Sequence, residues 1–367
     1  MKVIIWSDAH LHAHRIGNKI DEKGYSTRLL DGIKAVDAIS QAVIANGASL
    51  RLFVGDLFHV RGRLVPSIFN PVFDSFVRAH RDASYVDFLI PGNHDDEARA
   101  EGEHAIRSLG AIEGVTVQDG YGFEVVRHGV DNLGIGWVCY HPDVDVMKAR
   151  LKEVALMAGD HGGSSPKVLL MHHGVDGVLP SVPDCGLSPA DLPTDVFDWT
   201  FVGDYHLYKE IVPCKAWSVG TPYQQSFGDA GKRCGYLVLD TDTGFVVHHE
   251  IENLPQFVCI ENIGGKIRIV GRAVAGDEYQ AGDFVRLRSD DREWLEKSAE
   301  YITKAGAAYV QAELVESNVA SVKIDDALKL ALNPTAMLEE WLKNAGLVPS
   351  RAAALRAMNK EILAEIG

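Results

Sequence analysis

Five short apolar segments each end abruptly in a cluster of polar residues, and this pattern limits the possible folds more than any other feature of the chain. Near-continuous apolar runs of this length are typical of strands that are buried on both faces of a sheet. In chain order, the segments and the residues that follow them are KVIIW before Ser7–His10, SLRLFV before Gly55–Asp56, YVDFLI before Pro91–Asp95, KVLLM before His172–Gly174 and WTFV before Gly203–His206.

Helical patterns lie between these segments. Residues 27–47 and 65–82 place apolar side chains at helical spacing, and Gly47 is expected to end the first helix. Pro71 is expected to break or kink the second helix, because proline removes a hydrogen bond from a helix interior. A third pattern covers residues 145–159. Alternating strands and helices predict a layered α/β fold, in which ligands bind beyond the carboxyl ends of the strands.

Beyond residue 110 the sequence predicts short strands, including a hairpin over residues 235–252, and then two further parts. A boundary near Asn253 to Pro255 precedes a small α/β module, in which Asp290 is a candidate N-cap for a helix over residues 290–306. The tail predicts two helices with apolar faces. The predicted domains are a main domain over residues 1–253, the small α/β domain over residues 254–325, and C-terminal helices over residues 326–367.

The 367-residue chain is acidic, with a formal net charge of −15, and 46% of its residues are hydrophobic. This content is enough for a large core and for more than one domain. A protein that binds DNA phosphates on its own normally presents an excess of Lys and Arg. Any binding of nucleic acid must therefore come from a local basic patch, from bound divalent metals or from a partner chain.

No apolar run approaches the roughly 20 residues that a membrane-spanning helix needs. Polar residues follow the first apolar segment too early for a signal peptide. The five cysteines are scattered without a Cys-x-x-Cys pair, which fits neither a zinc knuckle nor a disulfide framework. We therefore expect a cytoplasmic protein without a membrane partner, located in the host cytoplasm if the chain is viral.

The polar clusters contain seven side chains that could bind metal: Asp8, His10, Asp56, Asn93, His172, Asp204 and His206. Seven ligands are more than one ion usually takes from a protein, whereas two ions that share one carboxylate would use them all. Asp56 is the expected bridge, because Gly55 before it allows close approach. Oxygen and imidazole donors without thiolate suit Mn²⁺, Fe²⁺ or Zn²⁺, and three carboxylates favour Mn²⁺ or Mg²⁺. Such a pair of ions is suited to the hydrolysis of a phosphate ester.

His94 directly follows a candidate ligand and would face the site without binding a metal. It could stabilise the charge of the transition state or protonate the leaving oxygen, with Asp95 fixing its orientation and protonated form. His12, His14 and His173 flank candidate ligands, and we expect them to face solvent or to support the ligands.

The stretches SDAHLH, GDLFH, PGNHD, HHG and GDYH follow the order of the motifs of the calcineurin-like metallophosphoesterase superfamily, which the chain resembles. The stretches GDLFHVRGR and SVGTPYQQSFGDAGKRCGYLVLD resemble the SbcD branch, the nuclease subunit of a complex that repairs double-strand breaks. The resemblance covers residues 1–258 motif by motif. It implies a layered β-sandwich flanked by helices, a small α/β capping domain that contacts DNA, and C-terminal helices that bind an SbcC-type, SMC-like ATPase.

The resemblance also implies a role for each candidate residue. One metal would be held by Asp8, His10, Asp56 and His206, and the other by Asp56, Asn93, His172 and position 204. His94 takes the transition-state role, and His59 matches a histidine that lies near the DNA strand at the active site. Arg61 and Arg63 follow at once and could contact phosphates.

The family pattern Gly-His-x-His is altered in this chain, which has Asp204 where the first histidine should stand. Aspartate is a competent ligand for Mn²⁺ or Mg²⁺, so the second metal site is expected to persist with a different metal preference. The extra negative charge is also expected to weaken attraction for an anionic substrate. The alternative is a second site that binds no metal.

The activity that the resemblance implies is Mn²⁺-dependent exonuclease and endonuclease action on DNA in repair and recombination, with ATP used by the partner. It also implies a homodimer that pairs through residues 65–80 and 97–110. One alternative is a stand-alone phosphoesterase for small nucleotides or phosphoproteins, which would not need the C-terminal part. Another is a scaffold with a vestigial metal site that holds an ATPase on DNA.

Overall fold

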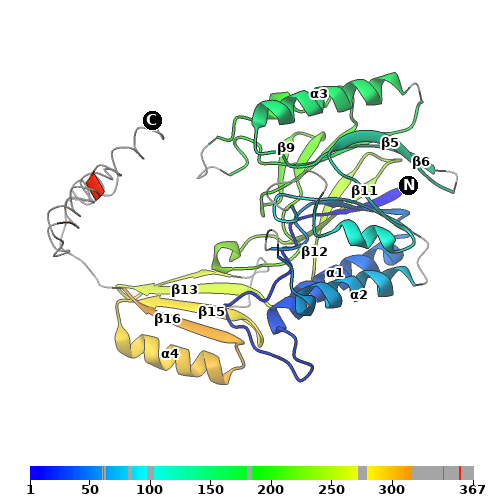
Figure 1. Cartoon of the computed structure of the whole chain (residues 1–367). Helices are drawn as coiled ribbons and strands as arrows, with labels where there is room; N and C mark the ends of the chain where they lie inside the picture. Colours follow the sequence, from blue (N-terminus) through cyan, green and yellow to red (C-terminus); the bar gives the residue numbers. More distant parts are fainter. Residues whose placement is uncertain are drawn as a thin grey trace. The chain divides into compact units, whose positions relative to one another are not determined.

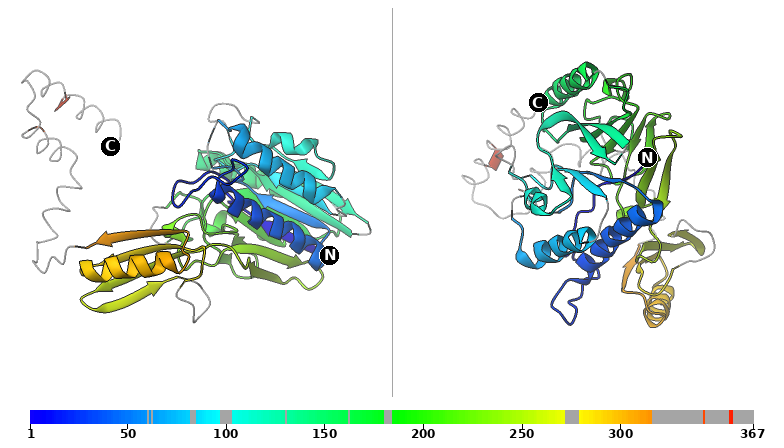
Figure 2. Two further views of the ribbon diagram at one scale, coloured as in Figure 1. Left: turned by 90° about the horizontal axis from the view of Figure 1, so that it is seen from below. Right: turned by 90° about the vertical axis from the view of Figure 1, so that its right-hand side faces the viewer.

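The computed structural model describes residues 1–59, 61, 63–81, 85–96, 103–129, 131–161, 163–179, 184–271, 279–315, 342 and 355–356. Residues Met1–Leu314 form one compact unit (Figures 1 and 2). The predicted C-terminal helices, residues 326–367, lie outside the described residues except for Leu342, Leu355 and Arg356. Among the helices in the described ranges, none combines the length and the apolar character that crossing a membrane requires.

Two six-stranded mixed sheets form the centre of this unit. The first sheet contains β1 (Lys2–Trp6), β2 (Leu50–Val54), β3 (Val86–Ile90), β4 (Val115–Val117), β11 (Gly235–Asp240) and β12 (Val246–Glu250), in the order β12-β11-β1-β2-β3-β4. The second sheet contains β5 (Tyr121–His128), β6 (Asp131–Val138), β7 (Lys167–His172), β8 (Trp199–Gly203), β9 (Lys209–Val212) and β10 (Ala216–Ser218), in the order β5-β6-β7-β8-β10-β9.

All five apolar segments are strands, which confirms that part of the sequence analysis. Strands β1, β2 and β3 are parallel neighbours in the first sheet, and β7 and β8 are parallel neighbours in the second. Because parallel neighbours run in the same direction, their carboxyl ends lie at the same edge of each sheet. The hairpin predicted over residues 235–252 is also present as the antiparallel pair β11 and β12.

The two sheets pack face to face, with helices on both outer faces. Alternate residues of β1 divide between two cores: Val3 and Ile5 pack between the sheets, whereas Ile4 and Trp6 pack against the helices. The outer face of the first sheet is covered by α1 (Thr27–Asn46) and α2 (Pro66–His80), and that of the second by α3 (Val144–Asp160) (Figure 1). The predicted layered α/β sandwich flanked by helices is therefore confirmed.

The two N-terminal helices show one confirmed boundary and lack one expected break. Helix α1 ends at Gly47, whose φ of 60° lies in the left-handed region that glycine adopts without strain. Helix α2 continues through Pro71, so the expected break is absent. Ile68, Val72 and Phe76 of α2 are buried against the sheet, and this packing holds the helix despite the hydrogen bond that proline removes.

A separate four-stranded sheet follows near the predicted boundary. It contains β13 (Phe257–Ile263), β14 (Lys266–Val270), β15 (Phe284–Ser289) and β16 (Tyr309–Leu314), in the order β14-β13-β15-β16, with α4 (Arg292–Lys304) between β15 and β16 in the chain. Strands β13 and β14 were not expected. Strand β14 is largely exposed and gives no continuous apolar run, whereas β13 is largely buried and follows the predicted boundary directly. Asp291, rather than the predicted Asp290, caps α4. Three short 3₁₀ helices complete the described elements: η1 (Arg107–Ala111), η2 (Pro189–Asp191) and η3 (Phe227–Asp229).

A buried ion pair links β2 to β3 within the first sheet. Arg51 is 1% exposed and Asp87 is fully buried, and Arg51 Nε donates to Asp87 Oδ1 at 2.6 Å. His80 Nε2 lies 2.8 Å from Asp87 Oδ2. Burial alone would raise the pKa of Asp87, but the positive charge of Arg51 and the hydrogen bonds lower it, so the carboxyl is ionised at neutral pH.

We expect Asp87→Ala to lower the free energy of unfolding by about 3–5 kcal/mol, because it leaves a buried guanidinium without its partner. Urea denaturation measures this loss. As a control, Glu261→Ala removes a partner of the partly exposed Arg288 and should cost no more than about 1 kcal/mol. Equal losses in the two variants would contradict the role given to the buried pair.

Candidate metal centre

The carboxyl ends of β1, β2, β7 and β8 bring five of the seven predicted ligands together. Ligand atoms of Asp8, Asp56 and His172 all lie within 4.8 Å of one another. The same is true of Asp8, His10 and His206. Asp8 belongs to both groups, and the two groups lie side by side. This arrangement matches a site for more than one divalent cation.

Asp56 lies between two imidazoles. Its Oδ2 is 3.3 Å from His10 Nε2, and its Oδ1 is 3.4 Å from His172 Nε2. The Asp56 side chain is almost completely buried, as are the two rings. One carboxylate oxygen therefore faces each group of ligands, which is the geometry that a bridging ligand requires.

Burial and mutual charge shift the pKa values of these groups. Burial raises the pKa of Asp8 and lowers that of His10. Burial alone would raise the pKa of Asp56 and lower that of His172, but the attraction between the two reverses both shifts. The centre thus holds carboxylates close together with little water, an arrangement that a cation stabilises.

Three buried polar atoms of this centre have no hydrogen-bond partner within the part of the chain that the structure describes. They are His10 Nδ1, His172 Nε2 and the side-chain oxygen of Asn93. The other nitrogen of His172, Nδ1, lies 2.6 Å from the Val54 carbonyl oxygen and donates to it, which leaves Nε2 free to bind a metal. An unpaired buried polar atom is costly, so these residues fit a divalent metal that would satisfy them.

The backbone is strained at four predicted ligands. Asp8, His10, Asp56 and Asp204 have φ values of 54°, 43°, 63° and 96°, in the left-handed region that residues other than glycine rarely adopt. Such strain is found where the surrounding structure imposes it, often at functional sites. Of these four residues, Asp8, His10 and Asp56 have side chains that meet at the centre.

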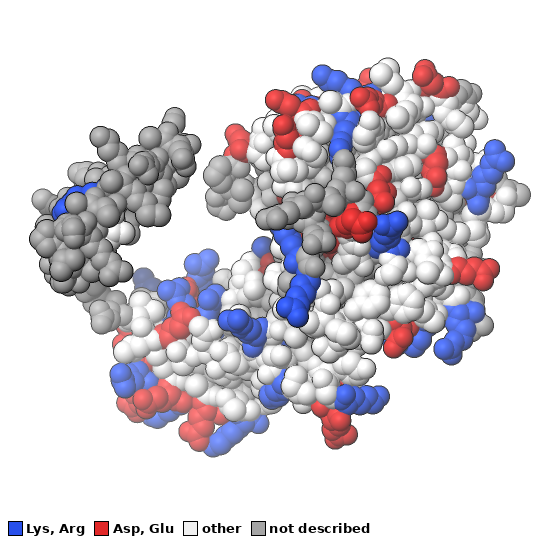
Figure 3. Space-filling model, viewed as in Figure 1, with Lys and Arg blue, Asp and Glu red and all other residues white. Residues whose placement is uncertain are grey.

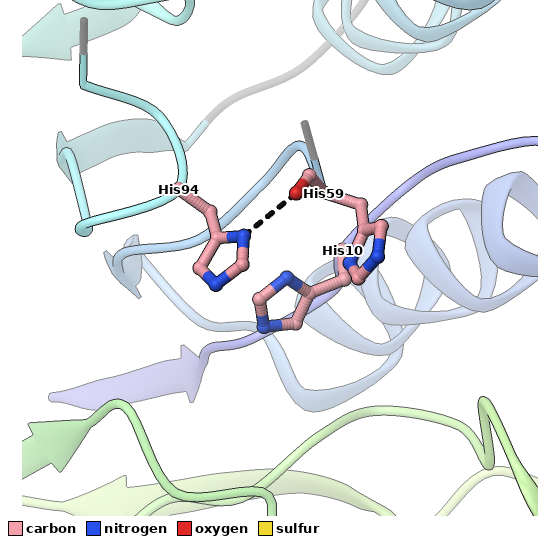
Figure 4. Close-up of side chains that lie close together, drawn as sticks. All are labelled: His10, His59 and His94. Carbon is pink, nitrogen blue, oxygen red and sulfur yellow. Dashed lines mark hydrogen bonds between the residues drawn. The ribbon is translucent and has the colours of Figure 1, made fainter. Parts of the chain in front are cut away.

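His94 is positioned by two hydrogen bonds. Its backbone N–H donates to Asp56 Oδ1 at 2.8 Å, and its ring Nδ1 lies 2.6 Å from the His59 carbonyl oxygen (Figure 4). Because a carbonyl oxygen only accepts, Nδ1 carries a proton and the second ring nitrogen remains available to a substrate. His94 and His10 lie edge to face, with ring centroids 4.7 Å apart.

The prediction that Asp95 orients the His94 ring is wrong. The buried Asp95 carboxylate instead accepts hydrogen bonds from backbone N–H groups, which belong to Asp56, Leu57, Phe58 and Gly92. Burial and the nearby Asp56 raise the pKa of Asp95 to about 7, and these N–H groups oppose the shift. Asp95 therefore holds the loop that carries Asp56 and His59. It affects the orientation of the His94 ring through the position of this loop.

Asp204 and the loop arginines lie at the margin of the site. The backbone N–H of Asp204 donates to Asp8 Oδ1 at 3.1 Å, but its carboxylate belongs to none of the three-residue ligand groups found among the described residues. Arg61 and Arg63 are exposed and lie close to His59 in the chain. Neither arginine lies within the buried centre.

Sequence reasoning missed the residues that hold the first ligand loop. Gln225 Nε2 and Thr221 Oγ1 donate to the Asp8 carbonyl oxygen at 2.8 and 3.0 Å. His206 Nδ1 lies 4.0 Å from Asp229 Oδ1. Thr221, Gln225 and Asp229 lie more than 200 positions from Asp8, and their only sequence signal was their place in a stretch of family resemblance.

The centre should not tolerate a methyl group at Gly55. A Cβ at this position would lie 2.3 Å from His172 Nδ1, so we expect Gly55→Ala to displace the ring and to reduce the metal content of the purified protein measured by mass spectrometry. Gly282→Ala is the matched control, because Gly282 has the same φ of 94° but open space around it. It should keep the metal content of the wild type. Unchanged metal in Gly55→Ala would contradict the placement of His172.

No protein-family model and no curated protein matches the chain. The solved structures that are similar in part include the following three. The sulfate thiohydrolase SoxB of Thermus thermophilus has a TM-score of 0.37 at 17% identity and covers 74% of this chain, which spans 56% of the SoxB chain. The similarity to the E. coli phosphoesterase YfcE has a TM-score of 0.32 at 12% identity and covers 69% of this chain and 95% of the YfcE chain. The similarity to GAP50, the anchor in the inner membrane complex of Plasmodium, has a TM-score of 0.41 at 10% identity and covers 69% of this chain and 89% of the GAP50 chain. At these TM-scores, the function of the chain must be argued from its own site.

Proposed function

We propose that the chain is a metal-dependent phosphodiesterase that cleaves DNA at a dinuclear centre. The observation that carries the proposal is the buried meeting of Asp8, Asp56 and His172 from three strand ends, with His10 and His206 beside them. Burying two carboxylates and three imidazoles costs free energy, so apolar residues would serve a purely structural role at this position better. Their unpaired atoms support metal binding.

One ion would be held by Asp8, His10, Asp56 and His206, and the other by Asp56, Asn93, His172 and Asp204. The mixture of carboxylate, amide and imidazole donors supports Mn²⁺, with Mg²⁺, Fe²⁺ and Zn²⁺ as alternatives. When bound, these ions would supply Lewis-acid chemistry for phosphoester hydrolysis. The chain itself contributes the fixed ligand positions, the exclusion of water and the groups that move protons.

His94 is the proposed proton-transfer group. Its Nδ1–H bond to the His59 carbonyl oxygen fixes one tautomer and the direction of the ring. When the second nitrogen is protonated as well, the ring is an imidazolium that can give this proton to the leaving oxygen, or donate a hydrogen bond to a phosphate oxygen as negative charge develops. The proposed role of Asp95 is to hold the loop that supplies this carbonyl group.

DNA is the proposed substrate, and an SbcC-type ATPase is the proposed partner in repair or recombination in the cytoplasm. The exposed His59, Arg61 and Arg63 lie on the loop next to His94, where they could contact a DNA strand. The net charge of −15 and the mixture of acidic and basic side chains in Figure 3 support a chain that gains most of its DNA affinity from other subunits. A homodimer that pairs through residues 65–80 and 97–110 would double the number of contacts with DNA; of these residues, 97–102 lie outside the described ranges.

The acidity of the chain also favours a second candidate, a stand-alone phosphoesterase for small nucleotides or phosphoproteins. A short substrate needs few phosphate contacts, so a net charge of −15 would not prevent its binding. The same centre and His94 would act on either substrate. The two functions therefore differ in the surface around the site and in the partner.

Activity tests the proposal directly. With Mn²⁺, the purified chain should hydrolyse a chromogenic phosphodiester and cleave linear duplex DNA slowly. His172→Ala should lower both rates by about 100-fold or more, since even residues that only support metal ligands contribute 10- to 100-fold. His161→Ala, at an exposed position away from the site, is the control. Activity on the chromogenic ester without cleavage of DNA, alone or with the ATPase, would favour the second candidate.

Asp204 decides whether the second ion is retained. We expect two anomalous scattering peaks in crystals of the wild-type protein grown with Mn²⁺, because an aspartate can replace the family histidine as a ligand. Asp204→His should also show two peaks and should shift the metal preference toward Zn²⁺. One peak in the wild type and two in Asp204→His would refute the proposed role of Asp204.

A further inference from the structure

A buried arginine joins the four-stranded sheet to α1. Arg28 lies in the first turn of α1 and is 1% exposed. Its guanidinium carbon lies 4.4 Å from the centroid of the Phe284 ring and 5.1 Å from that of the Phe257 ring. The two rings begin the neighbouring strands β15 and β13 (Figure 1), and they stack on each other with centroids 4.8 Å apart. Attraction between a cation and an aromatic face is strongest where water is excluded, so the four-stranded sheet helps to fix the Arg28 side chain.

Arg28 and the same sheet hold one loop segment. Arg28 Nη2 donates to the Gln225 carbonyl oxygen at 3.1 Å. Next to it, the side-chain oxygen of Gln224 accepts from the Phe257 backbone N–H at 2.6 Å. The Phe227 ring packs edge to face on that of Phe257, with centroids 4.9 Å apart. The segment is therefore attached to the four-stranded sheet twice directly and once through Arg28.

The Gln225 side chain reaches the first predicted ligand. It is almost completely buried, and its Nε2 donates to the Asp8 carbonyl oxygen and to Thr221 Oγ1, each at 2.8 Å. A longer contact of 3.3 Å joins the same nitrogen to the Ala9 carbonyl oxygen. Because Asp8 has a strained φ of 54°, a bond to its carbonyl oxygen helps to keep the backbone in this conformation.

A second predicted ligand faces the same segment. The buried Asp229 accepts hydrogen bonds at its Oδ2 from the backbone N–H groups of Gln225 and Ser226, each at 3.1 Å. Its other oxygen, Oδ1, lies 4.0 Å from His206 Nδ1. Carboxylates beside histidine ligands commonly orient the ring. Asp8 and His206 belong to one group of converging ligand atoms, so a single segment lies behind two ligands of that group.

We propose that Arg28 and Gln225 are positioning residues that couple the four-stranded sheet to Asp8 and His206. Both act through other groups: Gln225 acts through the Asp8 carbonyl oxygen and through Asp229, and Arg28 acts through Gln225. The inference rests on the proposed function, because it assigns Asp8 and His206 to a bound ion. The affinity for that ion would then depend on the position of the four-stranded sheet.

Mn²⁺ affinity tests the coupling in the full chain. Arg28→Met and Gln225→Met keep long side chains but remove the donors, so each should weaken the binding of one ion about 10-fold in calorimetric titration, the lower end of the effect of supporting residues. Arg286→Met is the matched control, because Arg286 stacks on Phe227 and donates to Cys259 Sγ within the same cluster. It should keep the affinity of the wild type. A fall as large as that in Arg28→Met would overturn the role of Arg28.

The double variant tests whether the two residues act in series. If Arg28 acts through Gln225, the combined variant should lose about 10-fold in affinity, as each single variant does, because residues of one network are not additive. A loss of about 100-fold would show two independent effects and would overturn the coupling. Unchanged affinity in either single variant would overturn it as well.

Crystals show which ion is affected. In Arg28→Met crystals grown with limiting Mn²⁺, the anomalous peak beside His10 and His206 should lose occupancy relative to the wild type, while the peak beside His172 should keep it. An equal fall of both peaks would indicate a general loosening of the centre, and no fall would indicate no coupling. Either result would contradict the inference.

Folding and activity are separated from the inference by two further measurements. Thermal melting checks each variant; if one is unfolded, the other decides, and unfolding of both would assign the two residues to folding and overturn the proposal. If the wild type binds Mn²⁺ but hydrolyses neither the chromogenic ester nor DNA, the proposed function fails, whereas the titrations still decide the coupling. A wild type that binds no Mn²⁺ would overturn the inference.

Discussion

The contact between His172 and three glycine-containing strand ends sets the spacing of the two sheets at the functional edge. A Cβ at Gly55, Gly92 or Gly203 would lie 2.3, 2.7 or 2.6 Å from an atom of the His172 ring. The ring thus occupies the space that side chains would fill, and it bonds to the carbonyl of Val54 on the opposite sheet. Larger residues at these positions would separate the sheets and spread the ligands apart.

The same edge concentrates charge that the fold alone does not balance. Asp8 accepts a hydrogen bond from the Asp204 N–H, and Asp56 accepts one from the His94 N–H, so the backbone offsets part of the cost of burial. The remaining unpaired atoms and the left-handed backbone are unfavourable without a cation. Metal binding and folding are therefore linked, and part of the binding free energy would offset this local strain.

The strands and most residues that meet at the candidate site could be predicted because both depend on local patterns: an apolar run ends, and a polar side chain follows. The role of Asp95 could not, since its four partners are backbone groups that only the folded loops bring together. Strand β14 was missed because an exposed strand has no apolar run to mark it. The helix through Pro71 shows packing outweighing local propensity, which a residue-by-residue analysis of sequence does not weigh.

His59 lies where two kinds of chemistry meet. Toward the centre, its carbonyl group orients His94 and its ring lies 5.4 Å from that of His10, beside carboxylates that suit harder cations. Away from the centre, its ring faces His14 and His12, where nitrogen is the only donor. One loop thereby connects the candidate metal centre, the proposed proton-transfer histidine and the protein surface.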